Sequence, residues 1–313
     1  MDIPPSSSLL PNTPLPSEPP VSTPVFPTPV QNLQEPIVIL SDVHIGLPSS
    51  KVNDPLQLAP LIQGAGTVIF NGDTVEMRTQ QKRSSAIATV EQLKKICAAY
   101  GATPIFINGN HDPVISTINQ VELWDSRILI THGDILFHKI SPWSWEGDVV
   151  GEEHTRLLNE LESADFVDFE KRLFISKKAS LIFEMHEHRF PMGRTHAILS
   201  FLKEFWPPWR PFQVLKYWAD TPKLAVQLSE TFRPHAEIIL IGHTHLGGIW
   251  QLHNKTIINT GSFLPFSGCF GVQIHNGYFA VREILEKNGK FKWGIPHFAC
   301  HRFKKKMQPR IEV

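Results

Sequence analysis

The sequence predicts an α/β fold, in which short buried strands alternate with helices and end in polar loops. Three observations support this prediction. Six short runs of β-branched and apolar residues recur between residues 37 and 258, each is followed by a loop rich in Asp, His, Asn or Gly, and one intervening segment has apolar residues at helical spacing. Continuous apolar runs are typical of strands buried on both faces, and their alternation with helices indicates an α/β core.

The predicted strands can be placed one by one along the chain. In order they are Ile37–Leu40, Val68–Phe70, Ile105–Ile107, Ile128–Ile130, Ile238–Ile241 and Ile257–Ile258. Between the second and third strands, apolar residues recur at helical spacing, which predicts a helix with one apolar face. They are Ile87, Val90, Leu93, Ile96, Cys97 and Tyr100. Ligands of α/β folds bind beyond the carboxyl ends of strands. We therefore expect the polar loops to converge on one site.

Composition divides the chain into a tail, a domain and a second tail. Residues 1–36 hold 11 of the 26 prolines and no Lys or Arg, which is typical of a disordered or polyproline-like segment and not of a secretory signal. Hydrophobic residues make up 42% of the 313 residues, enough for a sizeable core. We expect one domain over residues 37–300, with a helical insertion at about 150–232, and a basic tail over residues 301–313.

Charge and cysteine content exclude some classes of protein. The 30 basic residues balance 30 acidic ones, so a globally basic surface for nucleic acid is not indicated. Cys97, Cys269 and Cys300 fit no CxxC pattern, which favours reduced thiols in a cytoplasmic protein. No apolar run reaches the ~20 residues that span a bilayer, so any membrane contact is expected to be peripheral, at the inner membrane surface.

Side chains that bind metals fill five of the polar loops. In chain order they are Asp42, His44, Asp73, Asn110, His132, His243 and His245. Each Gly-Asp or Asn-Gly pair alone could be only a turn, but five such loops favour a shared site. Imidazole and oxygen ligands without thiolate suit Mn²⁺, Fe²⁺ or Zn²⁺. We expect two divalent transition-metal ions, with Mn²⁺ as the first choice. A pair of cations can activate a water molecule and neutralise phosphoryl oxygens, and phosphate-ester hydrolysis needs both functions.

The order of these residues resembles the calcineurin-like metallophosphoesterase family. The matching motifs are Asp42-x-His44, Gly72-Asp73, Gly109-Asn110-His111-Asp112, His132 and Gly242-His243-Thr244-His245. The resemblance covers roughly residues 37–265 and implies a sandwich of two mixed β-sheets flanked by helices. It implies a first metal held by Asp42, His44 and His245, and a second held by Asn110, His132 and His243. Asp73 would bridge the two metals.

The same resemblance implies a reaction. It is the hydrolysis of a phosphoester or pyrophosphate bond, with a hydroxide between the metals as nucleophile. His111 would protonate the leaving oxygen or bind the phosphate, and Asp112 would orient His111. The segment from Gly72 to Glu76 is similar to the UDP-diacylglucosamine diphosphatase branch, which serves lipid A synthesis, although that branch commonly has Arg where His111 stands.

The long segment between His132 and His243 has two interpretations. Residues 171–217 contain nine basic and three acidic residues among many aromatic ones. The segment is either a helical pair that packs on the core or a lid that grips an amphiphilic substrate and touches anionic lipid. Thr195 is expected to cap a helix with Phe201 on its apolar face. His186 and His188 share no helical face, so we expect them at the surface.

Taken together, these patterns predict a metal-dependent phosphoesterase whose substrate is a phosphorylated small molecule or is lipid- or nucleotide-linked. Within the same chemistry, a broad phosphodiesterase, a protein phosphatase and a nuclease are alternatives. An inactive interaction scaffold on the same fold is the alternative from another class. Loss of metal ligands would mark such a scaffold, and every ligand position of the motifs is present in this sequence.

Overall fold

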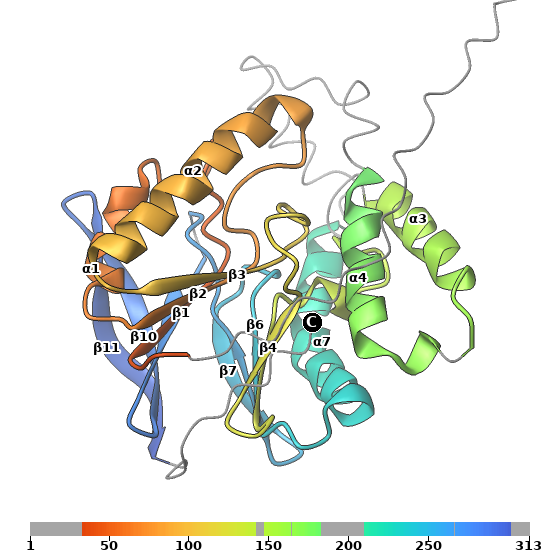
Figure 1. Cartoon of the computed structure of the whole chain (residues 1–313). Helices are drawn as coiled ribbons and strands as arrows, with labels where there is room; N and C mark the ends of the chain where they lie inside the picture. Colours follow the sequence, from red (N-terminus) through yellow and green to blue (C-terminus); the bar gives the residue numbers. More distant parts are fainter. Residues whose placement is uncertain (1–32, 142–146, 164, 183–209, 266, 302–313) are drawn as a thin grey trace, which may run out of the picture.

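Two mixed β-sheets stack face to face, and helices cover the outer face of each sheet (Figure 1). The computed structural model describes residues 33–141, 147–163, 165–182, 210–265 and 267–301. The predicted α/β sandwich of two mixed sheets flanked by helices is therefore confirmed.

The first sheet has six strands in the order β11-β10-β9-β1-β2-β3. Its three parallel strands are β1 (Ile37–Leu40), β2 (Thr67–Asn71) and β3 (Thr103–Ile107). Its antiparallel strands are β9 (Phe270–His275), β10 (Tyr278–Lys287) and β11 (Lys290–His301).

The second sheet has five strands in the order β4-β5-β6-β8-β7. Its parallel strands are β5 (Ile128–Thr131), β6 (Ile238–Ile241) and β8 (Lys255–Asn259). Its edges are formed by the antiparallel strands β4 (Gln120–Leu123) and β7 (Gly248–Leu252). The six strands predicted from the sequence are thus the parallel strands of the two sheets.

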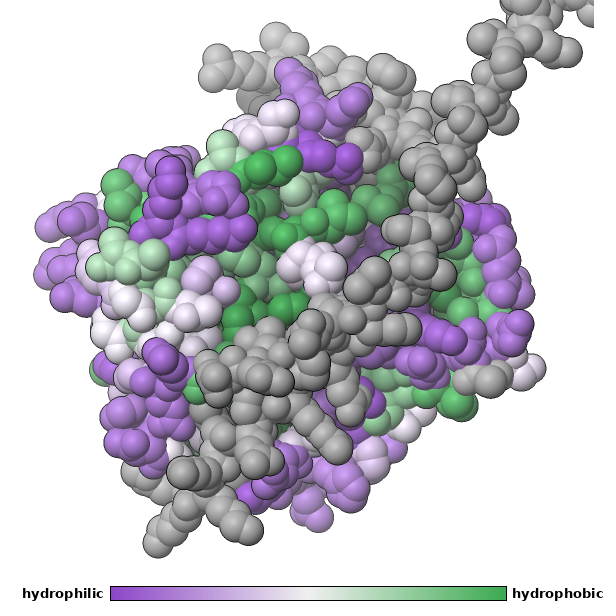
Figure 2. Space-filling view, in the orientation of Figure 1, coloured by the Kyte–Doolittle hydropathy of each residue, from purple (hydrophilic) through white to green (hydrophobic). Residues whose placement is uncertain are grey.

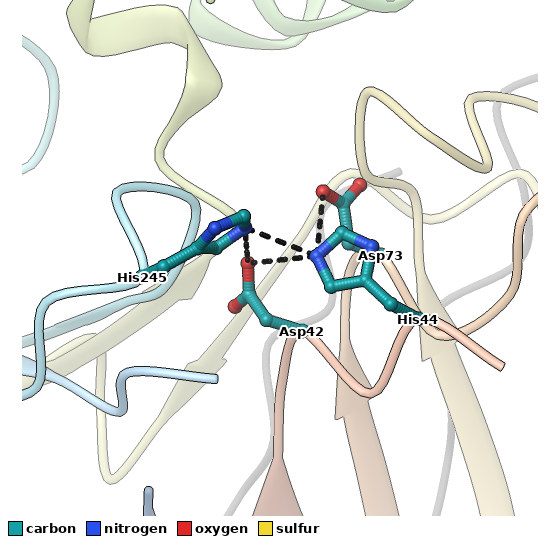
Figure 3. Close-up of side chains that lie close together, drawn as sticks. All are labelled: Asp42, His44, Asp73 and His245. Carbon is teal, nitrogen blue, oxygen red and sulfur yellow. Dashed lines mark hydrogen bonds and ion pairs between the residues drawn. The ribbon is translucent and has the colours of Figure 1, made fainter. Parts of the chain in front are cut away.

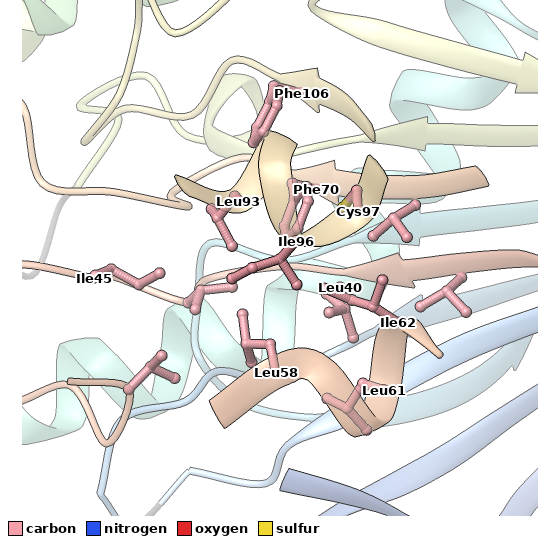
Figure 4. Packing of buried hydrophobic residues seen from close by; sticks show 14 of the residues in the cluster. Leu40, Ile45, Leu58, Leu61, Ile62, Phe70, Leu93, Ile96, Cys97 and Phe106 are labelled. Carbon is pink, nitrogen blue, oxygen red and sulfur yellow. The ribbon is translucent and has the colours of Figure 1, made fainter. Parts of the chain in front are cut away.

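Alternation along β1 shows how the layers form. Ile37 and Ile39 point into a cluster shared with residues of β5 and β6, which fills the space between the sheets. Val38 and Leu40 point the other way, into a cluster under the first helical layer (Figure 4). Because both faces of each parallel strand are buried, its position between the layers is fixed. The point at which the following loop begins is therefore fixed as well.

The first helical layer holds the one helix that the sequence predicted between two strands. The helix α2 (Gln80–Ala99) begins after Thr79, whose hydroxyl accepts from the backbone N–H of Lys82 at 3.3 Å. The short η1 (Pro55–Leu58) and α1 (Ala59–Ile62) lie in the same layer. The predicted apolar face was wrong at its ends, because Ile87 is 53% and Tyr100 42% exposed, while Ala86 is buried in their place.

The second helical layer follows the loop of His132. It contains η2 (Asp134–Leu136), α3 (Gly147–Asn159), η3 (Asp165–Val167), α4 (Phe169–Ser180) and α7 (Arg210–Phe232). Phe169 and Leu173 of α4 and Val226 of α7 pack in one cluster with residues of the second sheet. His186, His188 and the helix expected from Thr195 lie outside the described residues.

The surface has an apolar region. Hydrophobic residues gather in the middle of the face shown in Figure 2, and hydrophilic residues surround them. Among the described residues, no helix has both the length and the apolar character needed to cross a membrane. Cys97, Cys269 and Cys300 are reduced thiols.

Candidate metal centre

All predicted metal ligands lie at one end of the two sheets, where the parallel strands finish. They are Asp42 and His44 after β1, Asp73 after β2, Asn110 after β3, His132 after β5, and His243 and His245 after β6. Because the strand ends of both sheets meet there, side chains as far apart in sequence as His44 and His245 come into contact. The loops therefore converge on one site, as predicted.

The first ligand group consists of Asp42, His44, Asp73 and His245, with one ligand atom of each within 4.8 Å of the others. Nε2 of His44 lies 3.0 Å from Nε2 of His245 and 3.7 Å from Oδ2 of Asp73 (Figure 3). Nε2 of His245 lies 3.4 Å from Oδ1 of Asp42. Only His245 of this group is partly exposed.

The second ligand group consists of Asp73, His132 and His243, all buried. Nε2 of His132 lies 3.4 Å from Oδ1 of Asp73 and 3.1 Å from Oδ1 of Asn110, so the amide oxygen of Asn110 joins the group. Asp73 belongs to both groups, because its Oδ2 faces His44 and its Oδ1 faces His132.

The donor atoms of this site fit cations. Oδ2 of Asp42 and Oδ2 of Asp73 are buried and make no hydrogen bond within the described part of the chain. A buried carboxylate oxygen without a partner is costly, and a bound cation would remove that cost. Imidazole nitrogens beside carboxylate and amide oxygens are a ligand set for Mn²⁺, Fe²⁺ or Zn²⁺. The described residues thus contain two adjoining groups suited to hold metal ions.

Burial and neighbouring charges set the protonation of the imidazoles. Burial, with His111 nearby, lowers the pKa of His44 to about 3. Burial and the charge of His132 lower the pKa of His243 to about 4, so both rings are neutral at pH 7, the form that binds metals. Burial opposes charge on His132, but Asp73 and Asp42 outweigh it and raise its pKa to about 9. Metal binding must therefore displace a proton from His132.

Five of the ligands have a left-handed backbone. Their φ angles are 49° at Asp42, 54° at His44, 51° at Asp73, 69° at His243 and 59° at His245. Such angles are uncommon outside glycine and cost of order 1–3 kcal/mol each. Hydrogen bonds between loops hold them, as where the His44 N–H donates to the Asp73 carbonyl at 2.9 Å. Backbone strain of this kind gathers at functional sites.

Gly109 and Gly242 leave room for the carboxylates of neighbouring loops. Neither glycine has a positive φ, so the turn conformation does not require glycine there. A Cβ at Gly109 would overlap Oδ1 of Asp73, and a Cβ at Gly242 would overlap Oδ2 of Asp42. The Gly-Asn and Gly-His pairs of these loops therefore allow the ligands of a neighbouring loop to approach the backbone closely. This observation favours a shared site over independent turns.

His111 is partly exposed and lies beside Asp73. Its side chain is 14% exposed, and its Nε2 lies 4.0 Å from Oδ2 of Asp73. Its Nδ1 lies 3.0 Å from Oε2 of Glu76, and Arg78 donates to both oxygens of the same carboxylate. Burial disfavours charge on Glu76, but His111 and Arg78 outweigh burial and lower its pKa. Glu76 therefore stays ionised and orients the imidazole.

Asp112, which was predicted to orient His111, bonds to backbone N–H groups in this structure. Oδ1 of Asp112 accepts from the backbone N–H groups of Asp73 and Gly109, each at 2.9 Å. Its Oδ2 accepts from the N–H groups of Thr74 at 2.6 Å and Val75 at 3.2 Å. The carboxylate therefore shapes the loop that carries Asp73, because backbone donors of that loop already surround it. The side chain that contacts the His111 ring is Glu76, which lies 35 positions away, and no sequence pattern linked the two residues.

No protein-family model matches the chain, and no curated protein does. It is similar to the solved structure of a predicted phosphoesterase from Streptococcus pneumoniae, at 17% identity and a TM-score of 0.33, over 83% of this chain and 97% of that chain. It is also similar to wild-type Vps29 with Zn²⁺ from Entamoeba histolytica, at 13% identity and a TM-score of 0.36, over 83% and 98%.

A third similar structure is the cold-active protein-tyrosine phosphatase of a psychrophilic Shewanella species. Its identity is 15% and its TM-score 0.38, over 82% of this chain and 79% of that chain. Identities this low, with TM-scores below 0.5, assign neither a family nor an activity to the chain. The ligand geometry therefore has to support the function by itself.

Proposed function

We propose that the chain is a two-metal phosphoesterase, which hydrolyses a phosphoester or pyrophosphate bond. The observation that carries the proposal is the position of Asp73, whose two carboxylate oxygens face different ligand groups. A first metal would be held by Asp42, His44 and His245, and a second by Asn110, His132 and His243. When bound, such a pair supplies Lewis acid chemistry that activates water and neutralises phosphoryl oxygens.

The residues of the chain would hold the metals, limit the access of water and supply a proton to the leaving oxygen. The two oxygens of Asp73 place negative charge between the ligand groups, which opposes repulsion between two cations. All predicted ligands except His245 are buried, which limits the access of water to the centre. His111 lies beside Asp73 and is partly exposed. Because its Nδ1–H can donate to Glu76, the protonated ring holds its second proton at Nε2, from which it can pass to a leaving oxygen.

Within this class, we propose a diphosphatase that acts on a lipid- or nucleotide-linked substrate. Apolar side chains of the insertion support an amphiphilic partner: Phe174 of α4 is 43% exposed, and Phe212 and Leu215 of α7 are 72% and 56% exposed. Lys216 of α7 is 75% exposed next to Leu215 and forms an ion pair with Asp220 at 3.2 Å. Apolar and cationic groups together suit a lipid-linked phosphate, or peripheral contact with an anionic membrane surface.

A panel of substrates with Mn²⁺ tests the proposal. The panel holds a generic aryl diester, a phosphopeptide, a UDP-sugar lipid and single-stranded DNA. We expect hydrolysis of the aryl diester and a higher kcat/KM for the UDP-sugar lipid, because binding energy remote from the phosphorus is then used. Preference for the phosphopeptide or the DNA would overturn the lipid assignment. Two bound metals with no hydrolysis of any substrate would favour an interaction scaffold instead.

A further inference from the structure

The insertion reaches the metal centre through a buried ion pair. Nζ of Lys177, in α4, donates to Oδ1 of Asp134, and Oγ of Ser176 donates to Oδ2 of the same carboxylate at 2.8 Å. The side chains of Lys177 and Asp134 are 3% and 0% exposed. Asp134 stands two residues after the predicted ligand His132, at the start of η2.

This ion pair is not needed to bury α4. Leu173 of α4 packs in the cluster on the second sheet, and Ile175 and Ala179 pack in a cluster with α3. Burying two charges is costly, and apolar residues of similar volume often give equal or greater stability. The pair fixes the orientation of the Asp134 side chain, because Lys177 and Ser176 donate to different oxygens of its carboxylate.

The segment anchored in this way supports the second ligand group. Gly133, with φ of 102°, separates His132 from Asp134 and leaves the backbone there permissive. Further along, the Phe137 ring lies 6.1 Å from the His243 ring, and the carbonyl oxygen of Ile140 accepts from Nε2 of His243 at 2.7 Å. The segment from His132 to Ile140 thus carries one imidazole of the second group and holds the other.

We propose that Lys177 and Asp134 are positioning residues for the second metal, and that α4 sets the affinity of that ion without touching it. The inference rests on the proposed two-metal function. It follows from the contacts above: Lys177 fixes Asp134, Asp134 fixes the start of the segment, and the segment orients both imidazoles. The first group depends on the loops after β1, β2 and β6 and not on the loop of Asp134 after β5, so it should be affected little.

Titration of the metal-free protein with Mn²⁺, followed by calorimetry and by the electron paramagnetic resonance of bound Mn²⁺, tests this inference. In Lys177→Met the second ion should bind roughly 10–100-fold more weakly, the usual range when an outer support of a ligand is lost. The first ion should keep its affinity. His132→Ala and His245→Ala, which each remove a ligand of one group, identify the two binding steps.

A matched control and a milder variant separate positioning from stability. Arg233→Met breaks another ion pair beside the second sheet, that of Arg233 with the buried Glu122 of β4, and removes the contact of Arg233 with the Phe169 ring of α4. It should lower the melting temperature and leave both metal affinities unchanged. Ser176→Ala removes one donor to Asp134 and serves if Lys177→Met does not fold, with a smaller, few-fold weakening of the second ion expected.

The outcomes distinguish the failure of this inference from that of the proposed function. Unchanged affinity for two ions in both Lys177→Met and Ser176→Ala would overturn the positioning role alone. Equal weakening of both ions, or the same weakening in Arg233→Met, would also overturn it, because loss of stability would then explain the result. A wild-type protein that binds fewer than two ions would overturn the positioning role and the proposed function together.

Discussion

The two ligand groups differ in how firmly the fold holds their imidazoles. In the second group, Nδ1 of His132 lies 3.1 Å from the Asn71 carbonyl oxygen, and Nε2 of His243 lies 2.7 Å from that of Ile140. In the first group, Nε2 of His44 and Nε2 of His245 face each other at 3.0 Å. Nδ1 of His44 is buried and makes no hydrogen bond to any described residue.

This difference indicates how the centre is assembled. A hydrogen bond from the remote ring nitrogen fixes the tautomer and the orientation of a metal-binding histidine. His132 and His243 have such bonds, so the second group is set by the fold before any ion binds. An ion must replace the contact between His44 and His245 in the first group and that between His132 and Asn110 in the second. The groups differ in the remote nitrogens, because Nδ1 of His44 has no hydrogen bond to a described residue. Although a proton must leave His132, we expect this fixed orientation to make the second group bind its ion more tightly than the first.

The largest effect is expected from Asp73→Asn, which should abolish the difference between the groups because both share Asp73. Removing the charge between two cations should lower the content of both metals and slow turnover by about 10³-fold or more, equivalent to several kcal/mol of barrier. Elemental analysis and initial rates measure the two effects. Near-normal turnover in this variant would exclude a bridging role.

The next effect is expected from His111→Ala, which leaves both groups intact. Turnover should fall by roughly 10²–10⁴, as for the loss of a positioned acid–base group, while metal content stays the same. The loss should be smaller for a nitrophenyl ester than for an alkyl ester, because a good leaving group needs no proton. Equal losses for the two esters would indicate that His111 binds the phosphate instead.

Glu76→Gln should act through His111 and so have a smaller effect. Its carboxylate contacts Nδ1 of His111 at 3.0 Å, and the neutral amide should slow turnover by roughly 10–10²-fold at unchanged metal content. Because groups that act as a unit are not additive, the change should add little to His111→Ala. Kinetics of the two single variants and the double variant measure this, and multiplicative losses would mean that Glu76 acts separately.

The smallest effect is expected from Trp218→Phe. Nε1 of Trp218 donates to the carbonyl oxygen of Thr244 at 3.0 Å, between His243 and His245. A hydrogen bond is worth about 1 kcal/mol, or about five-fold in affinity. The first ion should weaken more than the second, because the Ile140 carbonyl also holds His243. Mn²⁺ titration measures both affinities, and a larger loss at the second ion would contradict the comparison.

Strands could be predicted where burial makes the sequence pattern simple. The parallel strands are buried on both faces and appear as continuous apolar runs, as in Ile238–Ile241. The antiparallel strands were missed because their patterns are mixed. β10 ends in exposed residues from Leu285 to Lys287, and β7 is only half-buried. Their pairing depends on partners far along the chain, which local patterns do not indicate.

In the candidate metal centre, the convergence of the loops could be predicted and the side-chain partners could not. Each of the seven predicted ligands stands in a short loop after a strand, so the motif order indicates that they meet. The partner of His111 depends on how two loops meet, and Glu76 lies 35 positions away from it. Lys177 and Asp134 are 43 positions apart, and their contact depends on how α4 packs. Such contacts follow from the fold and leave no local pattern.

Metal content tests the central claim most directly. The full chain, purified in the presence of Mn²⁺ and passed over a desalting column, should contain two ions per chain by elemental analysis. Stepwise chelation with EDTA should remove the first-group ion before the second, and activity should fall with it, because the chemistry needs both. One ion or none per chain, with activity unaffected by EDTA, would contradict the two-metal account.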